Sequence, residues 1–409
     1  MVKPRKHIYF YGIAENGRPG QASDISDLSD LSDASDFRPA PSTTPPQAPA
    51  AMPLHLPRPW QLTAADHRRL EALYARYRRQ WDTPAASSPM FVIDTPAPVA
   101  IPTWEERLAD PALMLQTELD LLRPHLELGD DQVPTVRVEF GTAQVAAAFG
   151  CRLVIPPNSQ AAAASHVLNA AEDVAQLRLP GPDAGWYGKL REWTQLWQEV
   201  LPDGLHLQHP DIQSAFNTAH LIRGNDILMD FYDAPDAVDR LLDLVTDYML
   251  QQTRRLNAMI GAGGGWFFDW GAMWRGAARI SNCSMHMISP KLYLEHVYPR
   301  DVRFLREIGG GRIHYCGATP VIPEFLQIPG LSGLDFDASL HDLWTVAEQA
   351  PPQVTLCVGF GNGSAGLNRL LAGDWPRKRN LIIRTQAASP AAARTLLSRL
   401  RHSVPGGCD

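Results

Sequence analysis

Two side chains that bind transition metals, His314 and Cys316, stand one residue apart in the segment Ile313-His314-Tyr315-Cys316-Gly317. Residues i and i+2 of a β-strand point to the same face, so an imidazole nitrogen and a thiolate sulfur would lie side by side. This pair of ligand types suits zinc. The same pattern also fits a hydrogen-bonded core histidine beside a buried thiol. Its place at a strand end before a glycine strengthens the metal interpretation, and both interpretations stay open at this point.

A zinc site needs at least one more protein ligand. The chain has five cysteines. Cys283 lies in a polar stretch and is the better candidate, whereas Cys357 has apolar neighbours and fits a core thiol. His286 is a further option. The sequence therefore predicts a zinc centre of His314, Cys316 and Cys283.

Other polar residues follow predicted strands and would lie near the same centre. Functional side chains of an α/β barrel are found at the carboxyl ends of its strands and in the loops that follow. On this ground we expect Asn282, Tyr315 and Asp337 to take part in catalysis.

Short apolar strands alternate with helices along most of the chain. We expect strands at residues 136–140, 266–269, 312–314, 334–336, 354–358 and 381–384, and helices at 143–149, 236–259 and 291–308 and after Ser389-Pro390. This repetition predicts an α/β protein with a (β/α)₈ TIM barrel, and an open doubly wound sheet is the alternative. Helical segments after Thr63 and after Asp110-Pro111 form an N-terminal helical extension.

The N-terminal segment differs in composition from the rest. Residues 1–59 contain an acidic Ser/Asp repeat and then a Pro/Ala/Thr run, which cannot bury enough apolar surface to offset chain entropy. We therefore expect a disordered low-complexity tail at 1–59 and a barrel domain at 60–405.

Composition limits the partners of the protein. The formal net charge of −7 and pI near 6.0 argue against nucleic-acid and membrane-surface binding. We expect no transmembrane helix and no signal peptide, because no long apolar segment occurs. The cysteines are few and odd in number, which fits free thiols in a reducing compartment, and we therefore expect the cytoplasm.

Several sequence blocks together resemble the uroporphyrinogen decarboxylase superfamily, which includes zinc-dependent methyltransferases that act on corrinoid proteins. The blocks occur in family order at residues 223–224, 229–235, 288–293, 298–299, 313–317, 361–362 and 388–390. The resemblance covers roughly residues 200–400, is weaker from Trp104 to Gly150, and implies a (β/α)₈ barrel.

Two chemistries within that superfamily differ in their expected residues. True decarboxylases carry an N-terminal arginine-rich segment that grips the substrate's carboxylates, and the corresponding Trp104 region lacks the arginine pair. His314 and Cys316 match the His-x-Cys zinc ligands of the methyltransferases. The third ligand of those enzymes is usually a cysteine after the last strand, where this chain has Thr385-Gln386. Either Cys283 replaces it, or zinc is bound differently, or zinc is absent.

The resemblance implies a zinc-dependent methyltransferase that moves a methyl group from a corrinoid on a partner protein to the thiol of a small-molecule substrate. One alternative is a metal-free decarboxylase or other lyase acting on a carboxylate, with Asp337, Tyr315 or Arg384 near the mouth. Another is a non-catalytic binding barrel, in which Trp266, Trp270 and Trp274 would line an apolar pocket.

Overall fold

The computed structural model describes residues 54–83, 88–157, 159–261 and 264–406. Most of the predicted disordered tail, residues 1–53, lies outside these ranges. Residues 54–59 are described and form no helix or strand, and the backbone N–H of Arg58 donates to Gln116 Oε1 at 2.9 Å. Contacts with the folded chain therefore begin slightly before Trp60, where we expected the barrel domain to start.

Eight parallel strands form the centre of this part of the chain and confirm the predicted barrel. They are β1 (Met90–Asp94), β2 (Thr135–Val136), β5 (His206–Leu207), β8 (Ala278–Ser281), β9 (Gly311–Tyr315), β10 (Leu331–Asp337), β11 (Thr355–Gly359) and β12 (Leu381–Gln386). Six of them form one sheet in the order β1-β12-β11-β10-β9-β8, and β2 pairs with β5. All of these pairings are parallel.

Isolated backbone contacts join the two sheets into a ring. Gln213, just after β5, forms a parallel bridge with Ser281 of β8. Asp131, just before β2, reaches β1: its N–H donates to the Phe91 carbonyl at 2.8 Å, and its side chain accepts from the Phe91 N–H at 2.8 Å. Neighbours in the ring follow chain order without the reversal of a doubly wound sheet, so that alternative is excluded.

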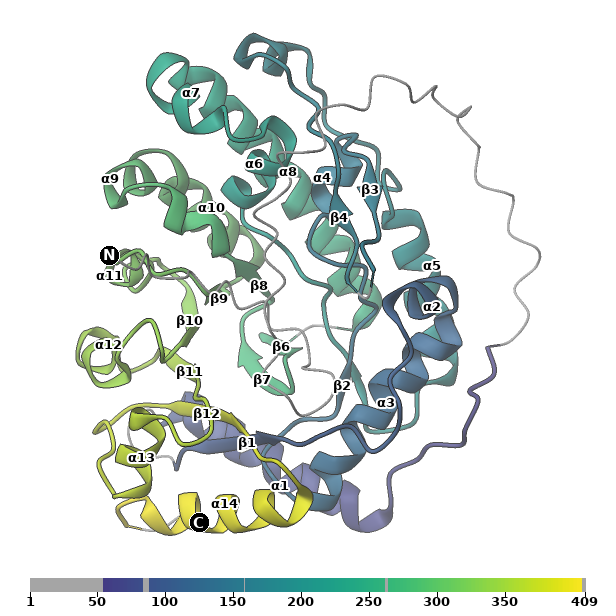
Figure 1. Ribbon diagram of the computed structural model, residues 1–409, viewed down its shortest axis with the longest axis vertical. Coiled ribbons are helices and arrows are strands. Elements are labelled where there is room, and N and C mark those ends of the chain that lie inside the picture. The colour runs from purple at the N-terminus through teal and green to yellow at the C-terminus, as the bar shows by residue number, and fades with distance from the viewer. Residues whose placement is uncertain (1–53, 84–87, 158, 262–263, 407–409) are drawn as a thin grey trace, which may run out of the picture. The chain divides into compact units, whose positions relative to one another are not determined.

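Helices lie around the outside of the strands (Figure 1). They are α2 (Trp104–Ala109), α3 (Pro111–Leu128), α4 (Gln144–Ala148), α5 (Tyr187–Val200), α6 (Ala215–Arg223), α7 (Ile227–Asp233), α8 (Pro235–Ile260), α9 (Pro290–Leu292), α10 (Tyr298–Ile308), α11 (Ile322–Phe325), α12 (Leu343–Gln349), α13 (Ala365–Leu371) and α14 (Pro390–Ser403). The longest, α8, buries Val238, Leu242 and Val245, whose spacing places them on one face. No helix among the described residues combines the length and the apolar character needed to cross a membrane.

Five shorter segments lie between these elements. They are the antiparallel pair β3 (Leu153–Val154) and β4 (Ala162–Ala163), the 3₁₀ turns η2 (Ala171–Gln176) and η3 (Cys283–Met287), and the π-helical turn η4 (Tyr293–Val297). The π turn lies between α9 and α10, so the helix expected over residues 291–308 is interrupted there.

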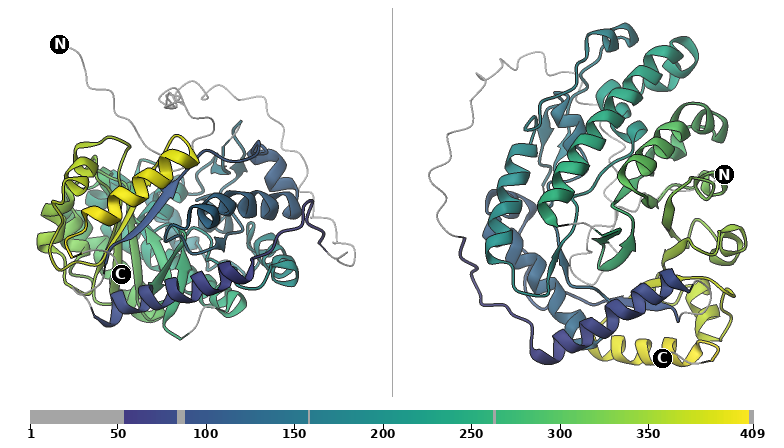
Figure 2. Two further views of the ribbon diagram at one scale, coloured as in Figure 1. Left: turned by 90° about the horizontal axis from the view of Figure 1, so that it is seen from below. Right: turned by 180° about the vertical axis from the view of Figure 1, so that it is seen from behind.

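The N-terminal helical extension begins with α1 (Ala64–Asp82). Thr63 caps it, because its side chain accepts a hydrogen bond from the Asp66 N–H. Leu73 and Tyr77 are buried at helical spacing, and the Trp81 ring packs edge-on against Trp266 with centroids 6.0 Å apart. The view from behind in Figure 2 shows α1, in purple, in the foreground.

Residues 266–269, expected as one more barrel strand, form half of an antiparallel hairpin instead. β6 (Trp266–Asp269) pairs with β7 (Ala272–Arg275). Trp270 and Gly271 make the turn with φ of 49° and 63°, the signature of a type I′ turn. The Gly271 carbonyl accepts from the Val133 N–H at 2.7 Å, and the Trp270 carbonyl accepts from Arg384 at 2.7 Å. The guanidinium carbon of Arg279, on β8, lies 4.9 Å from the Trp270 ring centroid. β8 and β12 lie on opposite sides of the ring, so the tip lies inside the barrel.

Three barrel strands, β1, β5 and β8, were not predicted, and β2 covers only the start of the strand expected at 136–140. In β8 the sequence Ala-Arg-Ile-Ser has a charged residue among its four, which hides the apolar pattern of a buried strand. Arg279 is nonetheless 4% exposed, because Asp211 and Asp269 pair with it inside the barrel.

Candidate metal centre

The three predicted zinc ligands come from two adjacent strands. His314 is the fourth residue of β9, Cys316 follows its last residue, and Cys283 opens the turn after β8. The backbone N–H of Asn282 donates to the His314 carbonyl at 2.8 Å and ties the two strand ends together. Because neighbouring parallel strands end at the same edge of the sheet, Cys283 lies beside the His-x-Cys pair.

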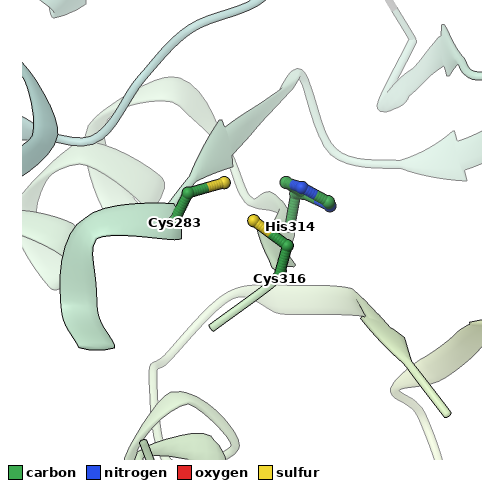
Figure 3. A group of neighbouring side chains, drawn as sticks. All are labelled: Cys283, His314 and Cys316. Atoms are coloured by element: carbon green, nitrogen blue, oxygen red, sulfur yellow. The ribbon is translucent and has the colours of Figure 1, made fainter. Parts of the chain in front are cut away.

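The ligand atoms of Cys283, His314 and Cys316 all lie within 4.8 Å of one another. Figure 3 shows both sulfur atoms directed toward the same space, with the imidazole beside them. His314 is 8% exposed, and the two cysteines are partly exposed. Two thiolates and one imidazole are a usual zinc donor set, and they leave a fourth position for another ligand. The donor set therefore fits zinc.

Asp335 orients the histidine. Its carboxylate forms a hydrogen bond with His314 Nδ1 and an ion pair with Arg312. The two residues pair across β9 and β10 in register, so both side chains point into the barrel. A carboxylate on one imidazole nitrogen fixes the tautomer and leaves the other nitrogen for the metal. Burial lowers the pKa of His314, which favours the neutral imidazole that a metal requires.

The two thiols are electrostatically linked. The hydrogen bond from Cys283 lowers the pKa of Cys316 well below its usual value, and burial opposes that shift. The same hydrogen bond, together with burial, raises the pKa of Cys283. Cys316 is thus the sulfur that ionises first, and Cys283 is the proton donor of the pair.

The tip of the hairpin lies next to this cluster. The Trp270 and His314 ring centroids are 5.0 Å apart, with the ring planes at 59°. Trp270 is only partly buried.

The three residues expected to be catalytic do not all lie near the candidate metal centre. Tyr315 follows His314 and points to the opposite face of β9, where its hydroxyl donates to the Thr319 carbonyl at 2.8 Å. Asn282 is fully buried, and its side chain donates to Asp301 at 2.8 Å. Neither side chain belongs to the metal cluster. Asp337 lies two residues after Asp335 on β10 and accepts from the Ser339 N–H at 2.7 Å. Of these three residues, only Asp337 lies on the strand face that points into the barrel, the same face as Asp335.

The other candidate ligands lie outside the cluster. Cys357 is buried within β11 at 4% exposure, as expected for a core thiol. His286 is exposed, and its Nδ1 bonds the Cys283 carbonyl at 2.7 Å. The described residues thus bring together the three predicted ligands and no fourth His, Cys or carboxylate.

Asp335 and Arg312 were not assigned roles from the sequence. Arg312 is completely buried and bonds both Asp269 and Asp335. Arg312 could have been noticed from the sequence, because it lies two residues before His314 and therefore on the same face of the strand. Asp335 lies directly across from His314 on the neighbouring strand. That pairing requires the strand register, which the sequence does not provide.

Asp301, which accepts a hydrogen bond from Asn282, should make the folding stability of the protein depend on pH. It is 2% exposed and also accepts from the Tyr293 hydroxyl at 3.1 Å. Burial raises its pKa to about 7, against the opposing effect of both hydrogen bonds. The unfolded chain has a pKa of about 3.9 and binds fewer protons between these values, so stability falls as pH rises from about 4 to about 7.

We expect Asp301→Asn to weaken this pH dependence, by up to roughly 4 kcal/mol between pH 4 and pH 8. Urea unfolding of both proteins at several pH values measures it. The free energy of unfolding should differ between wild type and variant by different amounts at pH 4.5 and pH 8. An equal difference at both pH values would contradict the raised pKa of Asp301.

Comparison with known proteins places this geometry in a family. The sequence profile of Uroporphyrinogen decarboxylase (URO-D) matches residues 93–362, more than half of the chain and all three candidate ligands. A methyltransferase from Methanosarcina mazei aligns over 81% of this chain and 97% of its own, with a TM-score of 0.58 and 16% identity, a likeness of fold. The apo form of a homocysteine methyltransferase from Escherichia coli aligns over 41% of this chain and 74% of its own, at 9% identity and a TM-score of 0.19, too low to carry an argument. A search of curated proteins gives no match. By its profile match and its barrel, the chain belongs to the uroporphyrinogen decarboxylase family.

Proposed function

We propose that this protein is a zinc-dependent methyltransferase that transfers a methyl group to the thiol of a small molecule. The observation that carries the proposal is the convergence of Cys283, His314 and Cys316, whose ligand atoms lie within 4.8 Å of one another at the carboxyl ends of β8 and β9. Family membership and the barrel agree with this function, since active sites of such barrels lie at this end.

Each nearby residue has a distinct part in the proposed centre. Cys283, Cys316 and the unprotonated nitrogen of His314 hold zinc, and Asp335 fixes the imidazole. When bound, zinc lowers the pKa of a substrate thiol and keeps the thiolate close to the methyl donor. The partial exposure of both cysteines leaves room for the substrate sulfur beside them.

The transfer itself is a displacement at the methyl carbon. An electron pair of the thiolate sulfur forms the new S–CH₃ bond, and the electron pair of the broken bond leaves with the donor. We propose a methyl-corrinoid on a partner protein as the donor, docked over the barrel mouth. We also propose a cytoplasmic location, where free thiols persist.

Metal analysis tests the proposal directly. We expect protein purified without chelator to contain about one zinc ion per chain, as three protein ligands and an open position require. Removing zinc with a chelator is expected to abolish thiol methylation, and adding zinc back to restore it. Wild-type protein that neither contains nor takes up zinc contradicts the proposal. Decarboxylation of a carboxylate substrate that survives the chelator would support the lyase alternative instead.

A further inference from the structure

Trp270, at the tip of the inner hairpin, has an unusual backbone conformation for a large side chain. Its φ is 49°, in the left-handed region. Type I′ turns favour Asn or Gly at this position, and a bulky residue stays there only when its surroundings hold it. Its N–H donates to Gln208 Oε1 at 2.6 Å, and its carbonyl accepts from Arg384 at 2.7 Å. Both contacts use the backbone, and any residue type other than proline could make them.

The indole itself contacts the candidate metal centre. Its centroid lies 5.0 Å from that of the His314 ring. The guanidinium carbons of Arg279 and Arg312 lie 4.9 Å and 5.2 Å from the same indole centroid. The indole therefore fills space next to the imidazole that water or a guanidinium group would otherwise take. Asp335 holds only one edge of the imidazole, through Nδ1, and that hydrogen bond alone leaves the tilt of the ring free.

We infer that Trp270 is a positioning residue for the metal centre, and this inference rests on the proposed zinc site. The indole fixes the plane of the His314 imidazole and excludes water from its side, while Asp335 fixes the tautomer. Together they aim the remaining nitrogen at the space between Cys283 and Cys316. The strained turn brings this side chain to the histidine from the inner hairpin and not from a barrel strand.

Three substitutions separate the indole from the turn. Trp270→Asn suits a type I′ turn and removes the ring, so the variant is expected to fold. Trp270→Phe keeps an aromatic ring. Trp266→Phe changes a tryptophan of the same hairpin that packs on Trp81, away from His314. Thermal unfolding first establishes that all three are folded.

Zinc affinity, measured by competition with a chromophoric chelator, is expected to fall about 10–100-fold in Trp270→Asn, the usual effect of losing an outer-shell partner. The Trp270→Phe and Trp266→Phe variants should stay within about threefold of wild type. The visible spectrum of the cobalt-substituted protein should change only in Trp270→Asn, because the ligand field reports the orientation of His314. Wild-type zinc affinity and an unchanged cobalt spectrum in folded Trp270→Asn would overturn the inference.

A metal-free measurement separates this inference from the proposed function. In ¹⁵N–¹H correlation spectra of histidine side chains, the His314 ring should give one sharp set of signals in wild type and Trp270→Phe. In Trp270→Asn these signals should broaden or split, because the ring samples several orientations. Unchanged signals contradict the role of Trp270 even if the protein binds no zinc, whereas zinc-free wild type contradicts only the proposed function.

Discussion

Replacing Cys283 by alanine is expected to weaken zinc binding by at least roughly 100-fold, while replacing Cys357 leaves it unchanged. Structural zinc sites bind with about 10–16 kcal/mol in total, so one of three protein ligands contributes on the order of 3 kcal/mol, which corresponds to about 100-fold. Cys283 belongs to the cluster, and Cys357 does not.

Cys357→Ala is a matched control because it removes a more deeply buried thiol from the same barrel. Competition with a chromophoric chelator gives both affinities, and circular dichroism checks that both variants are folded. If the Cys283 variant binds zinc as tightly as wild type, the third ligand comes from elsewhere and the geometry of the centre is wrong. If both variants lose zinc, the loss comes from disturbed packing of the barrel core and not from removal of a ligand.

Arg312→Met is expected to destabilise the protein by about 3–5 kcal/mol, the usual cost of removing one partner from a buried ion pair. The Arg312 side chain is 0% exposed and lies between the carboxylates of Asp269 and Asp335. Methionine fills much of the volume but leaves Asp335 without a cation. Arg279 remains 3.4 Å from Asp269, so Asp269 keeps one partner.

Urea unfolding measures this loss, and Arg303→Met provides a control at the surface. Arg303 pairs with Asp247 and Glu307, but its side chain is 34% exposed, so the change should cost about 1 kcal/mol or less. Adding Asp335→Asn to Arg312→Met should recover part of the lost stability, because it removes the unpaired charge. Equal losses in the Arg312 and Arg303 variants would show that the buried network contributes little.

The three candidate metal ligands were predictable from the sequence because histidine and cysteine are residue types that bind zinc. His314 and Cys316 are two residues apart, and strand geometry alone places them on one face. The choice of Cys283 over Cys357 used only local polarity, and the structure brings Cys283 into the cluster. The barrel was predictable for a similar reason, since β10, β11 and β12 contain apolar residues over ordinary strand lengths and helices separate them.

The supporting residues were not predictable, because their roles depend on contacts between distant segments. Asp335 lies across from His314 only through the register of β9 and β10. Trp266 to Asp269 has the composition of a barrel strand, yet it pairs with β7 because a two-residue turn follows it. Tyr315 and Asn282 adjoin metal ligands in sequence, but strand alternation and the turn after β8 direct their side chains toward the surrounding helices.

The inner hairpin affects how reactants can reach the candidate metal centre. The tip of β6–β7 lies among the strands, and Trp81 of α1 packs on Trp266 of the same hairpin, so this segment occupies the interior of the barrel beneath the candidate metal centre. The candidate ligands lie at the carboxyl ends of β8 and β9, on the other side of the hairpin tip. Under the proposed function, a donor protein docked over the carboxyl end would cover the space next to the ligands. The thiol would then bind before the donor, and the methylated product would leave after the donor.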